Sequence, residues 1–332
     1  MSSHRELSYS LAINEALHQT MVEDPTVFLI GQGVKSPWYV GNTAQGLRER
    51  FGDERVIDTP VSENAMTGAA VGAALAGMRP VVVHPRMDFM FYAFDPIINE
   101  AANWHYMNGG RLPVSVVFWG IINRGGEQAA QHSQSLHGMF AQAPGLKVVM
   151  PATPHDAKGL MVAAIREPNP VVFIDDRWLY GMEAHVPEEI YAVEIGKARI
   201  ARPGTDVTIT ASSFMVQESL RAAELLAREG IETEVIDLRT IKPLDEETLV
   251  ASVRKTGRLV VADGGWRTCG VAAEIAALAA ERAFRSLRAP VARVTLPDCP
   301  APASAALEKV YYRHSADIIR AVRSILSYRH RF

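Results

Sequence analysis

One carboxylate stands out in the stretch TPVSENAMTGAAVGAALAG, residues 59–77, because it opens a run of small and apolar residues. Glu63 follows Ser62, a plausible helix N-cap, and Gly77 is placed to end the same helix. Burying an unpaired carboxylate costs several kcal/mol or makes it take up a proton. The residues alone leave two interpretations of Glu63. It is either a solvated acid favoured by the helix dipole, or a carboxylate held for chemistry at a strand–helix turn.

A histidine lies in the second stretch with chemical potential, GGEQAAQHSQSLHG at 125–138. Imidazole is the side chain best suited to moving protons near neutral pH, although a lone histidine is more often structural. Amide and hydroxyl groups surround His132, which favours a functional polar site. These neighbours are Gln128, Gln131, Ser133 and Gln134.

Several common chemistries are excluded by the motifs that the chain lacks. The sequence has no GxGxxG after a strand, no GxxxxGK[ST], no HExxH and no CxxC pair. The two cysteines, Cys269 and Cys299, form no disulfide framework and are typical of a reducing compartment, so a cytoplasmic location is expected. A formal net charge of −3 indicates no attraction to nucleic acid or membranes, and no apolar run reaches membrane-spanning length.

Short apolar strands alternate with helical patterns along the 332 residues, which predicts an α/β fold with two parallel-sheet domains. The first domain is expected over 1–190, a linker over 191–205 and the second domain over 206–332. Strands are expected at 26–33, 56–60, 80–85, 114–120, 146–151, 171–175, 206–212, 232–238, 258–265 and 290–296. Helices are expected at 62–77, 93–107, 155–167, 215–229, 245–256, 271–284 and 315–326.

Together, six segments resemble the beta subunit of the two-subunit, thiamine-diphosphate-dependent decarboxylase component of 2-oxo acid dehydrogenase complexes. They are GLRERFGDERVIDTPVSENAMTGAAVGAALAGMRPVV (46–82), FDPIINEAANWHYMNGG (94–110), AAQHSQSL (129–136), PGLKVVMPATPHDAKGLMVAAIREPNPVVF (144–173), DLRTIKPLDEETLVASVRKTGRLVV (237–261) and APVARVTLPDCPAP (289–302). The resemblance covers nearly the whole chain in order. It implies a transketolase-like pyrimidine-binding domain followed by a transketolase C-terminal domain. It also implies an enzyme that decarboxylates a 2-oxo acid and transfers the acyl unit.

The resemblance also implies a role for each residue that matches a position of the family's site. Glu63 would hydrogen-bond the pyrimidine ring of thiamine diphosphate, and His132 would handle protons as the acyl group passes to its acceptor. Val61, Phe89 and Tyr92 would contact the cofactor together with Glu63. A family loop whose backbone carbonyls hold potassium would lie at Val116, Ala164, Ile165, Glu167 and Asn169.

The chain lacks a GDG motif followed some thirty residues later by asparagine, which is the usual grip on magnesium and the diphosphate. In the family that grip belongs to the alpha subunit. The resemblance therefore implies an enzyme that is active only with an alpha partner, in a heterotetramer. Gly68, Gly72 and Ala76 recur at four-residue spacing and would allow a close subunit contact.

The sequence departs from the family at positions that affect substrate and partner. Trp119 stands where the family has an arginine, in a segment expected beside the cofactor pocket, which puts pyruvate and branched-chain substrates in doubt. Arg285 and Arg288 stand where acidic residues help to dock the lipoyl acyltransferase core, so docking is in doubt. Two alternatives therefore stay open. One is a split transketolase-like or acyloin-forming carboligase subunit, and the other is a non-catalytic regulatory subunit.

Overall fold

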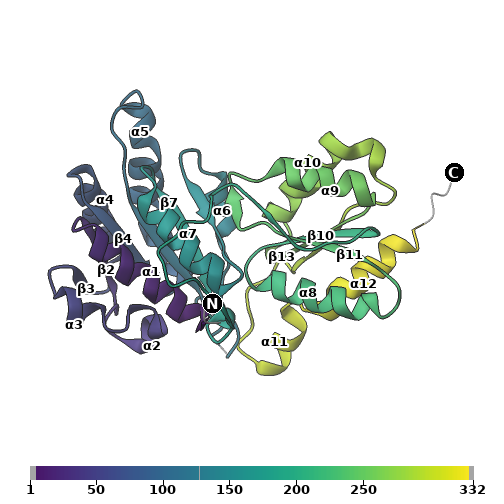
Figure 1. Cartoon of the computed structure of the whole chain (residues 1–332), viewed down its shortest axis with the longest axis horizontal. Coiled ribbons are helices and arrows are strands. Elements are labelled where there is room, and N and C mark those ends of the chain that lie inside the picture. The colour runs from purple at the N-terminus through teal and green to yellow at the C-terminus, as the bar shows by residue number, and fades with distance from the viewer. Residues whose placement is uncertain (1–4, 127, 329–332) are drawn as a thin grey trace.

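The computed structural model describes residues 5–126 and 128–328 and shows two α/β units side by side (Figure 1). The first sheet has seven strands in the order β12-β6-β7-β5-β4-β2-β3, and the second has five in the order β14-β13-β10-β11-β9. Within each sheet one edge strand is antiparallel and the other neighbours pair in parallel. The predicted α/β class with two mainly parallel sheets is therefore confirmed.

The strands of the first sheet are nearly continuous apolar runs, as expected for a sheet covered on both faces. They are β2 (Val27–Gln32), β3 (Val56–Thr59), β4 (Arg79–His84), β5 (Val117–Ile122), β6 (Lys147–Val149), β7 (Val171–Asp176) and the antiparallel β12 (Thr240–Lys242). Helices α1 (Tyr9–Glu23) and α7 (Pro154–Arg166) pack on one face of this sheet. The other face is covered by α4 (Glu63–Leu75), η2 (Met87–Ala93), the π-helix η3 (Asp95–Ala102) and α6 (His137–Gln142).

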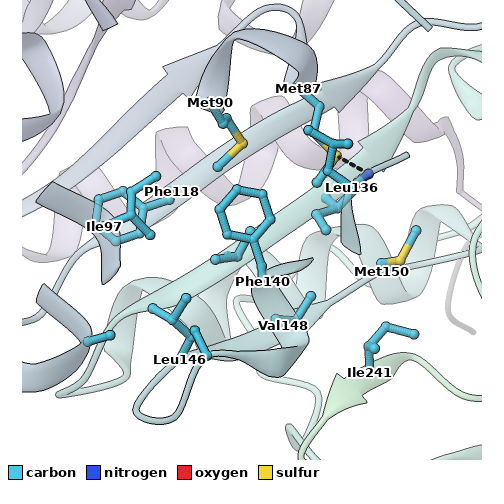
Figure 2. Packing of buried hydrophobic residues seen from close by; sticks show 14 of the residues in the cluster. Met87, Met90, Ile97, Phe118, Leu136, Phe140, Leu146, Val148, Met150 and Ile241 are labelled. Atoms are coloured by element: carbon cyan, nitrogen blue, oxygen red, sulfur yellow. Dashed lines mark hydrogen bonds between the residues drawn. The ribbon is translucent and has the colours of Figure 1, made fainter. Parts of the chain in front are cut away.

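Alternate side chains of β5 enter the two different cores, because successive residues of a strand point to opposite faces. Trp119 packs with the α1 and α7 side, whereas Phe118 packs with the α4 side. Figure 2 shows the core on the α4 side of the sheet, in which Met87, Met90 and Phe140 pack with Phe118. This core fixes the start of η2, the short helix that leads from the end of β4 into the site described below.

The remaining elements complete the second unit and the edges of the first. The second sheet consists of β9 (Arg199–Arg202), β10 (Val207–Ala211), β11 (Thr233–Asp237), β13 (Leu259–Trp266) and β14 (Ala292–Leu296). Its helices are α8 (Phe214–Ala227), α9 (Glu246–Thr256), α10 (Val271–Ala283), α11 (Ala305–Tyr311) and α12 (Ser315–Leu326). Smaller elements are β1 (Glu6–Ser8), α2 (Pro37–Val40), α3 (Leu47–Phe51), α5 (Asn103–Met107) and β8 (Glu183–His185).

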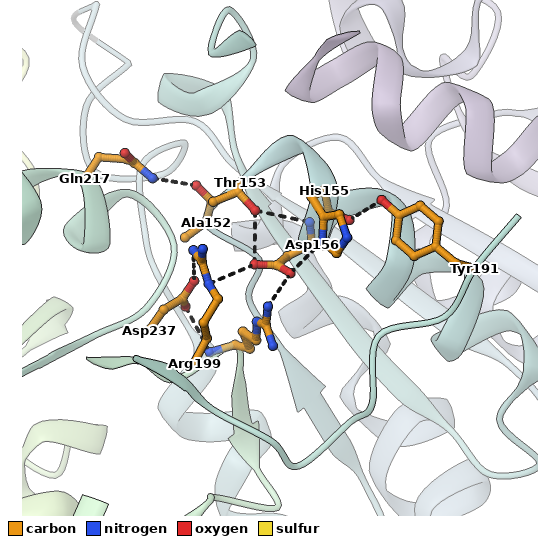
Figure 3. A network of polar contacts seen from close by, with 9 residues as sticks. Ala152, Thr153, His155, Asp156, Tyr191, Arg199, Gln217 and Asp237 are labelled. Carbon is orange, nitrogen blue, oxygen red and sulfur yellow. Dashed lines mark hydrogen bonds and ion pairs between the residues drawn. The ribbon is translucent and has the colours of Figure 1, made fainter. Parts of the chain in front are cut away.

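A buried polar network joins the two units (Figure 3). Asp156 at the start of α7 accepts from Arg239 Nη2 at 2.8 Å, and Arg199 Nη2 pairs with Asp237 Oδ2 at 3.3 Å. Burial opposes ionisation of Asp156, but the His155 hydrogen bond and the charges of Arg239 and Arg199 outweigh it and lower its pKa. The units are thus connected by charge as well as by apolar contact.

The division into domains stays a prediction, because two strands do not pair as its boundaries would require. β9 lies inside the predicted linker 191–205 and pairs with β11 of the second sheet. β12 comes from the second half of the chain yet pairs with β6 of the first sheet. In the part of the chain that the structure describes, no helix has the length and apolar character needed to cross a bilayer.

The expectation that Trp119 lies beside the cofactor pocket is corrected by its place in the core. The indole is fully buried, stands edge-on to Phe173 at a centroid distance of 6.4 Å, and donates Nε1–H to Asp175 Oδ1 at 3.1 Å. It faces the α1 and α7 side of the sheet and does not line the cavity that contains Glu63. The physical reason is the alternation of β5, which directs residue 119 away from the site.

We expect Asp175→Asn to make stability less dependent on pH between about pH 4 and pH 7. Burial raises the pKa of Asp175 from 3.8 to about 7, against hydrogen bonds from Tyr180 and Trp119 and the charge of Arg177. The folded protein therefore binds more protons than the unfolded chain in this interval, so stability falls as pH rises through it. The free energy of unfolding, measured in urea at about pH 5 and at about pH 8, should fall between the two pH values in the wild type. In the variant this fall should be smaller by at least about 1 kcal/mol. Equal losses in both proteins would contradict the assignment.

Candidate active site

The carboxyl ends of β2, β3 and β4 meet at a cavity of about 240 Å³. Ligand sites of α/β proteins lie at this edge of a parallel sheet. The walls of the cavity come from the ends of β2 and β4, the turn after β4, the short helix α2, the start of α4, η2 and the loop after β5. They are Gln32, Trp38, Tyr39, Glu63, His84, Pro85, Arg86, Phe89 and His132.

Glu63 is the first residue of α4, and its carboxylate lines the cavity while half-buried. Ser62 occupies the N-cap position, but its side chain makes no capping hydrogen bond. The helix ends at Leu75, and Gly77 follows with a φ of +92°, as the sequence suggested. Among the described residues no basic side chain forms an ion pair with Glu63. The carboxylate is therefore available to a ligand in the cavity.

His132 and Phe89 come together from different segments. Their rings meet edge-to-face, with centroids 5.3 Å apart and planes at 89°. The loop that carries His132 is tied to η2, because the backbone N–H of Gln134 donates to Asp88 Oδ1 at 3.1 Å. Burial raises the pKa of Asp88, while the Gln134 bond and the nearby His132 act in the opposite sense. The imidazole and the aromatic face are thus held at one wall of the site.

The loop that carries His132 is attached to the second unit at both ends. Near its start, Arg124 Nη1 donates to the Gly264 carbonyl at 3.4 Å. At its far end, His137 Nε2 lies 2.9 Å from Asp263 Oδ1, and His137 Nδ1 lies 2.9 Å from Ser135 Oγ. The side chains that make both attachments are buried. The position of His132 therefore depends on how the two units are packed.

Sequence reasoning missed His84 and Arg86, which line the cavity from the end of β4 and the turn after it. His84 is fully buried, and its Nε2 lies 3.3 Å from Thr67 Oγ1. Burial lowers the pKa of His84 to about 3, so the ring is neutral, and its Nδ1 has no partner among the described residues. The signal that could have found both residues is the presence of two polar side chains at and just after the end of a buried parallel strand.

Two of the residues expected to bind cofactor do not line the cavity. Val61 and Tyr92 are each 70% exposed, and the Tyr92 carbonyl accepts from Asn64 Nδ2 at 3.2 Å. The structure thus brings Glu63, Phe89 and His132 together and leaves these two on the outer surface. Their contact with cofactor stays a prediction.

Three of the five carbonyls expected to hold potassium already accept protein hydrogen bonds. Arg79 Nη1 donates to the Ile165 carbonyl at 2.8 Å and to the Glu167 carbonyl at 3.4 Å. The Val116 carbonyl accepts from the backbone N–H of Val171 at 3.0 Å. A carbonyl oxygen has two lone pairs, so these bonds leave each oxygen with further acceptor capacity.

A larger cavity of about 900 Å³ lies between the two units, beside α6, α10 and β13. His137 and Cys269 are among its walls, but it contains none of the residues expected to act on a cofactor. Size alone would favour this cavity as the active site. The smaller one joins a carboxylate, an imidazole and an aromatic face, so its chemistry makes it the better candidate.

The donor set of the smaller cavity fits the aminopyrimidine half of thiamine diphosphate. That ring needs a carboxyl partner for a ring nitrogen and an apolar or aromatic surface for its face. Glu63 supplies the first and Phe89 the second, and the buried His84 Nδ1 is a further polar atom without a partner among the described residues. The residues present therefore fit this half of the cofactor.

Two domain families match the chain in order. The transketolase pyrimidine binding domain matches residues 5–182, and the transketolase C-terminal domain matches residues 196–318. The chain is also 44% identical to the pyruvate dehydrogenase E1 component subunit beta of Rickettsia felis, over 96% of this chain and 97% of that protein. The chain belongs to the E1 beta-subunit family.

This beta subunit is similarly close to a protein named for a different substrate. It is 45% identical to the acetoin:2,6-dichlorophenolindophenol oxidoreductase subunit beta of Cupriavidus necator, over 97% of this chain and 98% of that one. A solved split gene transketolase, an inactive beta4 tetramer, matches with a TM-score of 0.78 and 24% identity, over 97% of this chain and 98% of that one. That likeness shows the fold. The resemblance seen in the sequence is therefore confirmed for family and fold.

Proposed function

We propose that this chain is the catalytic beta subunit of a thiamine-diphosphate-dependent enzyme that decarboxylates a 2-oxo acid and transfers the acyl unit. The observation that carries the proposal is the meeting of Glu63, Phe89 and His132 in one cavity. Relatives that match over nearly their full length, named as beta subunits of a pyruvate dehydrogenase E1 component and of an acetoin:2,6-dichlorophenolindophenol oxidoreductase, support it.

The residues of this chain divide the work by chemistry. Glu63 holds a proton at the pyrimidine ring nitrogen, and Phe89 supports the face of that ring. When bound, thiamine diphosphate would supply the carbon that adds to the keto group and would hold the electron pair left behind when carbon dioxide departs. His132 holds or moves a proton at the acyl group and its acceptor, a task for which imidazole is suited near neutral pH.

The other half of the active site would come from an alpha subunit that holds magnesium and the diphosphate. The described residues contain no group of three or more His, Cys, Asp or Glu placed to hold a metal. The expected contact face of α4 is exposed, and a Cβ added at Gly68 or Gly72 would meet nothing within 4 Å. Both observations support a heterotetramer in which further chains complete the site. The two free cysteines fit a cytoplasmic enzyme.

The proposal includes potassium at the carbonyls of Val116, Ala164, Ile165, Glu167 and Asn169, where it would brace the end of α7 against the start of β5. We expect potassium chloride to raise the melting temperature of the assembled enzyme relative to choline chloride at equal ionic strength. Arg79→Lys serves as a comparison, because the Arg79 guanidinium donates to the Ile165 and Glu167 carbonyls that would also bind the ion. Identical melting temperatures in both salts would contradict a potassium site.

The experiment that tests the function uses the chain copurified with its alpha partner and offers one 2-oxo acid with three acceptors. Reduction of an artificial electron acceptor reports decarboxylation, a lipoyl acyltransferase core reports dehydrogenase chemistry, and an aldehyde reports carboligation. Arg285 and Arg288 are exposed beside the exposed Phe284, so we expect weak docking to a basic binding domain of the core. Decarboxylation with any acceptor supports the proposal. Its absence with all three would leave the regulatory-subunit alternative.

A further inference from the structure

We propose that Arg86 binds an anionic group, a carboxylate or a phosphate, which a reactant keeps after carbon dioxide has left. The inference rests on the proposed function and narrows its substrate class. The anionic group belongs either to the 2-oxo acid, as a second carboxylate, or to the acyl acceptor. Both sources present the same chemistry to a guanidinium.

Arg86 is placed to meet a reactant because it follows β4 by two residues and lines the same cavity as Glu63 and His132. Its side chain is half-buried. Its Nη1 donates to the Pro85 carbonyl at 2.8 Å. With the Asn123 amide turned to present its oxygen, Nε and Nη2 donate to Asn123 Oδ1 at 3.1 and 3.3 Å. A guanidinium has five N–H groups, so two remain for a ligand within the described structure.

Arg86 forms no ion pair in the part of the chain that the structure describes, because all its bonded partners are neutral oxygens. A second guanidinium, Arg177, is close enough to act on it and is bonded to the carbonyls of Trp38 and Tyr39. Burial and the repulsion from Arg177 lower the pKa of Arg86, and Asp88 acts in the opposite sense. Asp88 is itself buried and bonded to Gln134. An incoming anion would relieve this excess of positive charge.

The reaction itself indicates which anion benefits from Arg86. In decarboxylation the bond to the departing carboxylate breaks, its electron pair stays with the acyl fragment, and carbon dioxide leaves neutral. A cation on the departing carboxylate would stabilise the reactant and lose its partner in the transition state, which slows the step. A cation on a retained anion holds the reactant throughout the reaction. Arg86 therefore suits a reactant with an additional negative charge.

The test compares, on the assembled enzyme, reactants that share a carbon chain and differ in one anionic group. One arm measures kcat/KM for 2-oxoglutarate and for 2-oxopentanoate, which have equal chain length, with an artificial electron acceptor. The other arm uses a fixed 2-oxo acid and compares glyceraldehyde 3-phosphate with glyceraldehyde as acceptor. We expect a preference for the additional charge of at least about tenfold in one arm, as charged hydrogen bonds provide. The arm that shows it identifies the source of the anion.

Arg86→Gln should abolish this preference, chiefly through KM of the charged reactant, and Arg86→Lys should restore part of it. Arg111→Gln is the matched control, because Arg111 is exposed and does not line the cavity. The comparison of charged and uncharged reactants is made on the wild-type enzyme. It therefore still tests the proposal if a variant fails to fold. Decarboxylation without a charge preference in either arm would overturn the role of Arg86 and leave the proposed function standing. Absence of all decarboxylation would overturn both.

Discussion

Glu63→Gln should lower turnover of the assembled enzyme by at least about a hundredfold, because general acid–base steps contribute that much or more. Glutamine keeps the size and one acceptor oxygen of the side chain but cannot share a proton with a ring nitrogen. Glu63 starts α4 and has no ion-pair partner among the described residues, so assembly and stability should change little.

The matched control is Glu54→Gln, which makes the same chemical change at an exposed position before β3. Turnover of this control should equal that of the wild type. Both variants are checked by light scattering for assembly and by circular dichroism for folding. Equal turnover in Glu63→Gln would return Glu63 to the simpler interpretation of a solvated acid in the first turn of a helix.

The second large effect concerns the cofactor, which we expect this chain alone to bind at least about a hundredfold more weakly than the assembled enzyme does. The cavity of about 240 Å³ offers contacts to the pyrimidine half, and the sequence has no GDG grip for the diphosphate. Losing the contacts of a diphosphate and its magnesium removes several charge-assisted bonds, each worth about a factor of ten or more.

Calorimetry measures this difference directly, with thiamine diphosphate and magnesium titrated into the chain and into the copurified pair. Light scattering on the same samples tests the expected heterotetramer. A dissociation constant of the isolated chain within about tenfold of that of the pair would contradict the prediction. A single heterodimer as the largest species would contradict the proposed packing of the exposed face of α4 that contains Gly68 and Gly72.

The sequence predicted the framework of the fold because its signals are local. Apolar strands and the small-residue helix that begins at Glu63 depend on near neighbours in the chain, and α4 was expected within a few residues of its observed ends. The helix α1 was missed although its buried residues, such as Ile13, Ala16 and Leu17, recur at the three- and four-residue spacing of a helix face. The strand β12 was missed because its pairing with β6 joins residues about ninety positions apart.

Three of the five catalytic and cofactor-binding residues that the family resemblance supplied line the cavity, whereas Val61 and Tyr92 are exposed outside it. Glu63, Phe89 and His132 were expected together and do line one cavity. His84 and Arg86 carry no motif, and their approach to Glu63 depends on the parallel pairing of β2 with β3 and β4. Trp119 was expected in the site because its sequence position was suggestive, but the alternation of β5 directs it into the opposite core.

The central claim is that Glu63 of this chain activates the cofactor by holding a proton at the pyrimidine ring. The most direct measurement is the rate at which the reactive thiazolium carbon of bound thiamine diphosphate exchanges hydrogen for deuterium, followed by rapid quenching and nuclear magnetic resonance. Wild-type assembled enzyme should exchange this hydrogen at least about a hundredfold faster than Glu63→Gln with the cofactor equally bound. Equal exchange rates in the two proteins would contradict the claim.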